Sequence, residues 1–176
     1  MARRRRKPPL PVLPVGVRLG VDVGSVRIGV AVSDPAAAMA LPLEVVPADR
    51  HGGADLDRVA ELARSYGALE VVVGLPLTLR GEEGAAAAAA RSFADRLAPR
   101  VAPVRVRMVD ERLSTVTAAA ELRAAGVSSR EGRGKVDASA AAVLLQSALD
   151  ADRAARAAAD KHETPVPGAD QDDSTT

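Results

Sequence analysis

The sequence predicts an α/β fold in which helices pack on both faces of a mixed five-stranded sheet. Two observations support this prediction. Three short strand patterns come first, which is typical of an antiparallel meander, and helical and strand patterns then alternate, which is typical of parallel strands joined by helices. The predicted order is three strands, a helix, a strand, a helix, a strand and two further helices. Loops at the carboxyl ends of the parallel strands are the expected place for a ligand.

The meander is predicted from apolar residues at every second position. This alternation covers residues 17–23 and again 27–33. Gly24 and Ser25 between them suit a two-residue hairpin, with glycine at the position that needs a positive φ. Residues 41–46 predict a short third strand.

The central elements follow from a change of period. Apolar side chains at helical spacing predict a helix up to about Tyr66, and Gly67 suits its end. The continuous apolar run 69–74 predicts a strand that is buried on both faces. An alanine-rich helix is predicted over 85–97, and we expect it to end before Pro99.

The last predicted elements are a strand, a helix, a basic loop and a second helix. Residues 104–109 predict a strand whose arginines lie on one side, which commonly protects a sheet edge. Ser114 and Thr115 can cap a helix that runs to Gly126. Residues 127–135 are expected to be a flexible basic loop, and a long helix is predicted over about 136–159.

The composition excludes several classes of site. Aromatic residues make up 1% of the chain, so the core must be built from aliphatic side chains, and a platform for base stacking is excluded. The absence of cysteine excludes disulfides, thiolate zinc sites and a cysteine nucleophile, and it fits a reducing compartment. His51 and His162 are the two histidines, and they are far apart in sequence, which argues against a histidine-rich metal site.

Charge and proline content divide the chain into three parts. Residues 1–14 form a basic, proline-rich arm with a charge of +5, residues 15–160 form the expected folded domain, and residues 161–176 form an acidic tail. Both ends have the composition of disorder. The arm either contacts nucleic acid or only aids solubility. The prolines rule out a signal peptide, and no apolar run approaches the roughly 20 residues of a membrane span, so we expect a cytoplasmic protein.

Asp22 is the first candidate for chemistry. It lies near the end of the first strand, on the face that carries Gly20, and the next strand offers Gly29 and Ala31 there. This face leaves room for something bulky, and a carboxylate that projects into it needs a partner. The alternative is that Asp22 accepts backbone N–H groups and shapes the hairpin.

Two further acidic positions could join it. Asp110 and Glu111 follow the last strand, and Asp137 opens the last helix, where an acid also complements the helix dipole. Carboxylates from these three places could meet at one sheet edge, where they would repel each other unless a cation were present. Oxygen ligands alone suit Mg²⁺ or Mn²⁺, and such a cluster is typical of two-metal phosphoryl transfer.

Four segments resemble the successive motifs of the YqgF/RuvX family. These segments are RLGVDVGSVRIGVAVSD, VVVGLPLTLRGEEG, VRMVDERLST and GKVDASAAAVLLQ, and together they span about residues 17–150. Members of this family are RNase H-like nucleases linked to maturation of the small-subunit ribosomal RNA precursor, and they were earlier described as Holliday junction resolvases. By this resemblance Asp22, Glu111 and Asp137 match the family's catalytic, metal-binding acidic triad. The sequence departs from the family pattern at Arg80-Gly81-Glu82, which leaves the preference of that loop open.

The resemblance implies a nuclease that uses Mg²⁺ or Mn²⁺, with two ions expected, to process the 5′ end of pre-16S rRNA during ribosome biogenesis. The implied partner is structured nucleic acid and not a membrane, and the protein is expected to be a monomer or a weak homodimer. The side chains expected to contact phosphate are Arg27, Arg80, Arg112, Arg133 and Lys135.

Three other functions stay open on the sequence. One is a Holliday junction resolvase, and another is a nucleic-acid binding module without catalysis, which would gain nothing from a repulsive acidic cluster. The third is an actin-like ATPase or sugar kinase, since Asp-x-Gly-Ser in a hairpin also suits a phosphate loop. That architecture needs two such domains, for which 176 residues are too few.

Overall fold

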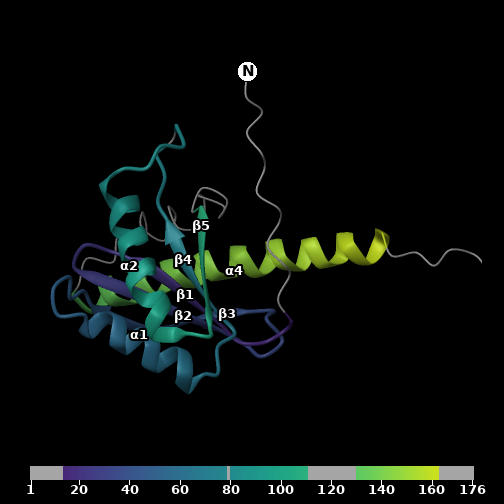
Figure 1. Cartoon of the computed structure of the whole chain (residues 1–176), viewed down its shortest axis with the longest axis horizontal. Helices are drawn as coiled ribbons and strands as arrows, with labels where there is room; N and C mark the ends of the chain where they lie inside the picture. Colours follow the sequence, from purple (N-terminus) through teal and green to yellow (C-terminus); the bar gives the residue numbers. More distant parts are fainter. Residues whose placement is uncertain (1–13, 79, 111–129, 163–176) are drawn as a thin grey trace, which may run out of the picture.

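The computed structural model describes residues 14–78, 80–110 and 130–162, and it confirms the α/β fold (Figure 1). Five strands form one sheet in the order β3-β2-β1-β4-β5. The elements, in chain order, are β1 (Arg18–Val23), β2 (Arg27–Ser33), β3 (Ala40–Pro47), α1 (Ala54–Ser65), β4 (Glu70–Leu75), α2 (Ala85–Val101), β5 (Arg105–Asp110) and α4 (Arg130–His162).

Strand direction gives the sheet two distinct ends. β1, β2 and β3 form the expected antiparallel meander, whereas β1, β4 and β5 run parallel to one another. We call the end where the three parallel strands finish, at Val23, Leu75 and Asp110, the carboxyl edge. The opposite end, where they begin, is the amino edge. The carboxyl edge is where ligands bind in sheets of this kind.

Helices cover both faces of the sheet, as predicted. α1 and α2 pack on one face over a core of aliphatic side chains to which Phe93 adds a single ring, and α4 packs on the other. The carboxyl-terminal part of α4 extends past the sheet (Figure 1). Gly67 follows α1 with a φ of 59°, a left-handed conformation that favours glycine, so its expected role at the helix end is confirmed. Among the described helices, none has both the length and the apolar character needed to cross a membrane.

α4 approaches the sheet closely because Gly20, Gly29 and Ala31 present little or no side chain beneath it. A Cβ atom on Gly20 would lie 2.7 Å from Cβ of Leu145. A Cβ atom on Gly29 would overlap the carbonyl oxygen of Asp137, and Ala31 is fully buried under the same helix. The room that the sequence indicated on this face is therefore filled by α4 itself.

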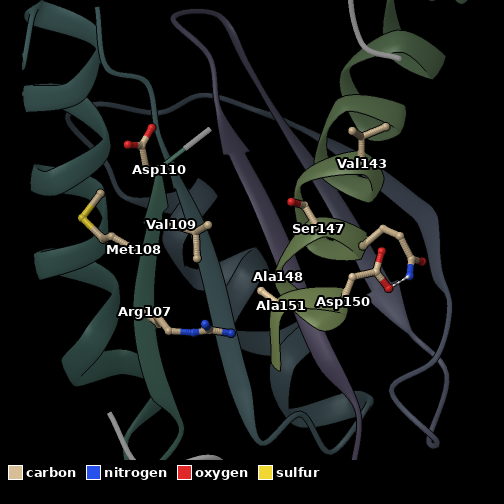
Figure 2. Close-up of a pocket in the computed structure, with 10 residues that line it drawn as sticks. Arg107, Met108, Val109, Asp110, Val143, Ser147, Ala148, Asp150 and Ala151 are labelled. Atoms are coloured by element: carbon tan, nitrogen blue, oxygen red, sulfur yellow. Dashed lines mark hydrogen bonds between the residues drawn. The ribbon is translucent and has the colours of Figure 1, made fainter. Parts of the chain in front are cut away.

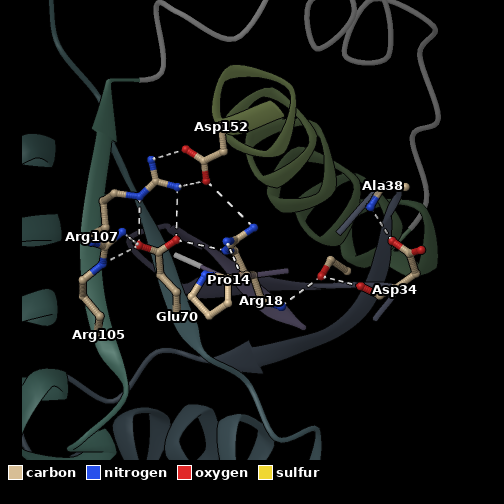
Figure 3. Close-up of polar contacts among 9 residues, drawn as sticks. Pro14, Arg18, Asp34, Ala38, Glu70, Arg105, Arg107 and Asp152 are labelled. Carbon is tan, nitrogen blue, oxygen red and sulfur yellow. Dashed lines mark hydrogen bonds and ion pairs between the residues drawn. The ribbon is translucent and has the colours of Figure 1, made fainter. Parts of the chain in front are cut away.

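Charged side chains close the amino edge under α4 (Figure 3). The first residues of the three parallel strands, Arg18, Glu70 and Arg105, are direct neighbours in the sheet. Glu70 is fully buried and accepts hydrogen bonds from Arg105 at 2.8 Å and Arg107 at 3.0 Å, while Arg107 also binds Asp152 of α4 at 2.9 Å. Burial lowers the pKa of Arg18, and the charge of Glu70, whose Oε2 lies 3.4 Å from Arg18 Nε, opposes this shift.

β5 is the edge strand, as expected. Its two arginines do more than protect this edge, because both bind the buried Glu70 and so compensate a negative charge in the interior.

The structure corrects two expected backbone features. Three residues rather than two separate β1 from β2, and Gly24 does not have a positive φ. Glycine is needed at position 24 for another reason, because a Cβ atom would overlap the carbonyl oxygen of Arg27. α2 does not end before Pro99 but runs on to Val101, which is buried on the core and so offsets the hydrogen bond that proline cannot donate.

The last helix begins earlier than expected. α4 starts at Arg130, so six of the nine residues of the expected basic loop over 127–135 are helical. Gly132 and Gly134 each disfavour a helix by about 1 kcal/mol, but the arginine, glutamate and lysine residues around them have high helix propensity. The helix expected over 114–126 lies outside the described residues.

We expect Gly29→Ser to destabilise the fold by about 3 kcal/mol, because its Cβ atom forces α4 away from the sheet. Gly84→Ser is the matched control, since a Cβ atom there meets nothing within 4 Å and serine is favoured at the position before a helix. Urea unfolding of both variants measures the difference. Equal stability of the two would mean that α4 does not need the bare backbone at position 29.

Glu70→Gln is expected to lower the free energy of unfolding by about 3–5 kcal/mol, because it leaves buried guanidinium groups without their counter-charge. Glu83→Gln serves as the control, since it removes a carboxylate from an exposed pair with Arg91 and should have a much smaller effect. Denaturant titrations at one pH would test this, and a loss at position 70 no larger than at position 83 would contradict it.

Candidate active site

Asp22 faces α4 at the carboxyl edge. It is the second-last residue of β1 and pairs across the hairpin with Gly29, so both residues point to the same side of the sheet. That side is the α4 side, because the missing side chains of Gly20 and Gly29 make room for α4. Asp22 is half-buried there. The strand position and facing predicted for Asp22 are those found in the structure.

Asp137 reaches the same place from α4. Its carbonyl oxygen lies directly over Gly29, the cross-strand neighbour of Asp22. Two carboxylates that are far apart in sequence are thus brought to one corner of the molecule. Since α4 begins at Arg130, Asp137 lies inside the helix rather than in its first turn. The alternative role for Asp137, complementing the helix dipole, is therefore wrong, because that effect fades within the first turn.

Arg27 is the immediate partner of Asp137. Its Nε atom donates a hydrogen bond to Asp137 Oδ2 at 2.7 Å. The pair is partly exposed, with 37% of the arginine side chain and 32% of the aspartate side chain accessible. The phosphate contact predicted for Arg27 stays a prediction, and what the structure shows is that Arg27 compensates the charge of Asp137.

The structure describes the other predicted phosphate contacts to different extents. Arg80 is exposed in the loop after β4, in a turn closed by a hydrogen bond from Gly81 N–H to the Thr78 carbonyl at 2.8 Å. Gly81 has a φ of 80°, so the glycine of the divergent Arg80-Gly81-Glu82 motif is required by the turn. Glu111 and Arg112 lie outside the described residues. For Arg133 and Lys135 the structure describes only the backbone, in the first turns of α4.

Asp110 stands at one end of a groove between β5 and α4 (Figure 2). It is the last residue of β5 and pairs with Leu75 of β4, so it marks the carboxyl edge. The groove has a volume of about 720 Å³, and α4 contributes Ser147 and Asp150 to its wall. The groove joins the carboxyl edge to Arg107 of the charged network at the amino edge.

A smaller cavity of about 210 Å³ lies on the opposite face, beside the end of β1. Its wall includes Arg50, in the loop before α1, and Arg96, in α2. Sequence reasoning did not select either arginine. No local pattern could have done so, because they are 46 residues apart and meet only through the tertiary fold.

The donor chemistry of the site suits a hard divalent cation. Asp22 and Asp137 offer carboxylate oxygens, which Mg²⁺ and Mn²⁺ prefer, and no thiolate competes because the chain lacks cysteine. In the part of the chain that the structure describes, no three acidic or histidine side chains gather closely enough to hold a metal ion. The third acid of the expected triad, Glu111, is not among those residues.

Comparison with known proteins identifies one family. The family model described as RuvX, Holliday junction resolvase, matches residues 16–151. A protein of Rhodococcus jostii is 54% identical over 138 residues, which cover 77% of this chain and 78% of that one. A protein of Mycolicibacterium paratuberculosis is 56% identical over 140 residues, which cover 80% of this chain and 83% of that one. Both relatives are named as candidate pre-16S rRNA nucleases.

The fold is also found in a solved structure. RuvC of T. thermophilus, in complex with a Holliday junction substrate, matches with a TM-score of 0.53 and 20% sequence identity. The match covers 79% of this chain and 96% of that one. The RNase H-like sheet expected from the motifs is therefore confirmed.

Proposed function

This chain belongs to the RuvX family, and we propose that it is a metal-dependent nuclease that hydrolyses phosphodiester bonds of structured nucleic acid. The enzyme class predicted from the sequence, a nuclease and hence a hydrolase, is confirmed by its relatives. One observation supports the chemistry: the contact of Asp137 with Gly29 brings two carboxylates from β1 and α4 to one corner of the carboxyl edge.

The proposed catalytic residues are Asp22, Glu111 and Asp137, which would also hold the metal. Glu111 follows Asp110, the residue that ends β5 at this edge, so its place in sequence fits a third ligand. A pair of Mg²⁺ or Mn²⁺ ions, when bound, would supply activation of the attacking water and stabilisation of the leaving oxygen.

The remaining residues would hold the substrate. Arg27 keeps Oδ2 of Asp137 engaged, which orients the carboxylate, and its partly exposed guanidinium can also meet a phosphate. Because the chain has few aromatic rings, recognition through backbone and shape is favoured over base stacking. The further phosphate contacts that we propose are Arg80, Arg112, Arg133 and Lys135.

The proposed substrate is the 5′ end of pre-16S rRNA, which its relatives' names support, and the proposed location is the cytoplasm. A four-way DNA junction is the second candidate, favoured by the description of the family. Labelled RNA precursor and labelled junction, incubated side by side with Mg²⁺ and with EDTA, decide between the two substrates.

We also propose that the chain is divided into a basic arm (1–14), a nuclease domain (15–160) and an acidic tail (161–176), and that the protein is a monomer or a weak homodimer.

Asp22→Asn is expected to lower the cleavage rate by about 100-fold or more, because it removes a charged metal ligand and keeps the shape. It should also lose most of the stabilisation by Mn²⁺, which is about 1.4 kcal/mol for the natural protein at ten times the dissociation constant. Gel assays and thermal melts with Mn²⁺ and with EDTA measure both effects.

The control for this experiment is Asp57→Asn, which changes an exposed aspartate on α1 that pairs with Arg100. It should leave cleavage and the response to Mn²⁺ unchanged. Full activity of the natural protein in EDTA would refute metal-dependent cleavage. Metal-independent nucleic-acid binding without any cleavage would favour the non-catalytic module.

Arg27→Gln is expected to tighten Mn²⁺ binding by about two- to fivefold, because a cation that competes for Asp137 is removed and a partly exposed ion pair contributes about 0.5–1 kcal/mol. The same change should raise KM for the nucleic acid. Titration calorimetry with Mn²⁺ tests the first effect, with Arg153→Gln as a control that removes a charge paired elsewhere. Weaker Mn²⁺ binding in Arg27→Gln would contradict this account of the pair.

A further inference from the structure

The small cavity beside the end of β1 combines an apolar floor with two arginines. Val23, Ile28 and Phe93 contribute to its lining together with Arg50 and Arg96. Its volume of about 210 Å³ is below the roughly 300–1,000 Å³ of pockets for drug-sized ligands. The cavity is thus suited to a small group such as a phosphate with part of its sugar.

The two arginines are held in place without being neutralised. Arg96 Nη1 donates a hydrogen bond to the carbonyl oxygen of Arg50 at 3.2 Å, and Arg50 Nη2 donates to the carbonyl oxygen of Ser25 at 3.4 Å. Among the described residues, neither arginine forms an ion pair with a carboxylate. Backbone carbonyls position these guanidinium groups but leave their charge and most of their N–H donors available.

Nearby carboxylates are committed to backbone groups instead. Asp55, which lines the cavity, is 4% exposed and accepts hydrogen bonds from the N–H groups of Asp49 and Leu56. Asp49 accepts the N–H groups of Gly52 and Ala54, and these bonds lower the pKa of its carboxyl group. The acids therefore stabilise the loop before α1 and do not pair with the arginines.

The cavity and the proposed catalytic corner lie on opposite faces of the same strand end. Asp22 points toward α4, and Val23, the next residue, packs on the side of α1 and α2. A nucleic-acid strand that presents a phosphate to Asp22 and continues over the end of β1 would reach the arginines on the other side.

From these observations we propose that Arg50 and Arg96 form a phosphate-binding subsite for the nucleic-acid backbone next to the cleavage position. The partner is the sugar–phosphate chain, since guanidinium groups bind phosphate strongly and the cavity offers no room for a whole nucleotide. This inference rests on the proposed nuclease function and extends its substrate contacts to the face opposite α4.

The test compares two double variants that each remove two positive charges. Arg50→Gln/Arg96→Gln alters the subsite, and Gln keeps a donor for the carbonyl contacts. Arg64→Gln/Arg153→Gln is the matched control, with both changes at exposed positions, one in the last turn of α1 and the other on α4, where Arg153 pairs with Asp150. Thermal melts establish that both variants fold.

Binding of a fluorescent single-stranded RNA in EDTA is measured over a range of salt concentrations. The subsite variant should bind about tenfold more weakly, and its slope of log K against log salt should fall by about 0.7, the value for one lost phosphate contact on a single strand. Shortening the RNA from one end should abolish the difference from the natural protein. Arg96→Lys keeps the positive charge, and this single variant should retain most of the RNA affinity of the natural protein. With Mn²⁺, KM should rise while kcat stays within about twofold.

An unchanged affinity and salt slope in the subsite variant, or the same loss in the control, would overturn the inference. Because binding is measured in EDTA, this result is independent of cleavage. A natural protein that binds RNA through the subsite but cleaves neither RNA nor DNA with Mn²⁺ would refute the proposed nuclease and leave the subsite standing. If the natural protein cleaves nucleic acid but the Arg50→Gln/Arg96→Gln variant binds RNA as well as the natural protein does, the subsite is refuted and the proposed nuclease stands.

Discussion

The close contact between α4 and the sheet is the constraint on which the rest of the molecule depends. Backbone without side chains at Gly20 and Gly29 lets the helix lie against β1 and β2, with Leu145 and Asp137 directly over these positions. A helix kept further away by ordinary side chains would remove Asp137 from the corner that it shares with Asp22. The same residues that allow the core to pack therefore determine the geometry of the proposed site.

The same contact places acidic residues of α4 at both edges of the sheet. At the amino edge, Asp152 of α4 meets Arg107, and Glu70 is fully buried among guanidinium groups. At the carboxyl edge, Asp137 of the same helix pairs with the partly exposed Arg27. A buried charge is tolerated only when it is well compensated, whereas a partly solvated one can exchange its partner. The helix thus joins an edge whose buried charges are compensated to the edge where we propose that a cation binds.

Sequence patterns were sufficient for the strands and for the position of Asp22, because strand alternation and the small residues Gly20 and Gly29 directly encode which face is covered. They failed where tertiary contacts override local preference. Pro99 predicts the end of a helix, but α2 continues to Val101, whose side chain is buried in the core. The salt bridge between Arg27 and Asp137 could not be predicted either, since 110 residues separate the two and only the packing of α4 brings them together.

Arginine has two different roles at the carboxyl edge, and its hydrogen-bond partners distinguish them. Arg27 binds the carboxylate of Asp137, so a cation that bound to Asp137 would compete with it. Arg50 and Arg96 bind carbonyl oxygens, which fix the direction of a guanidinium without compensating its charge. A guanidinium that contacts only neutral groups binds an anion without first breaking an ion pair, so this part of the electrostatic cost is absent. This difference separates Arg27, which balances one of the proposed catalytic acids, from Arg50 and Arg96, the residues of the proposed phosphate subsite.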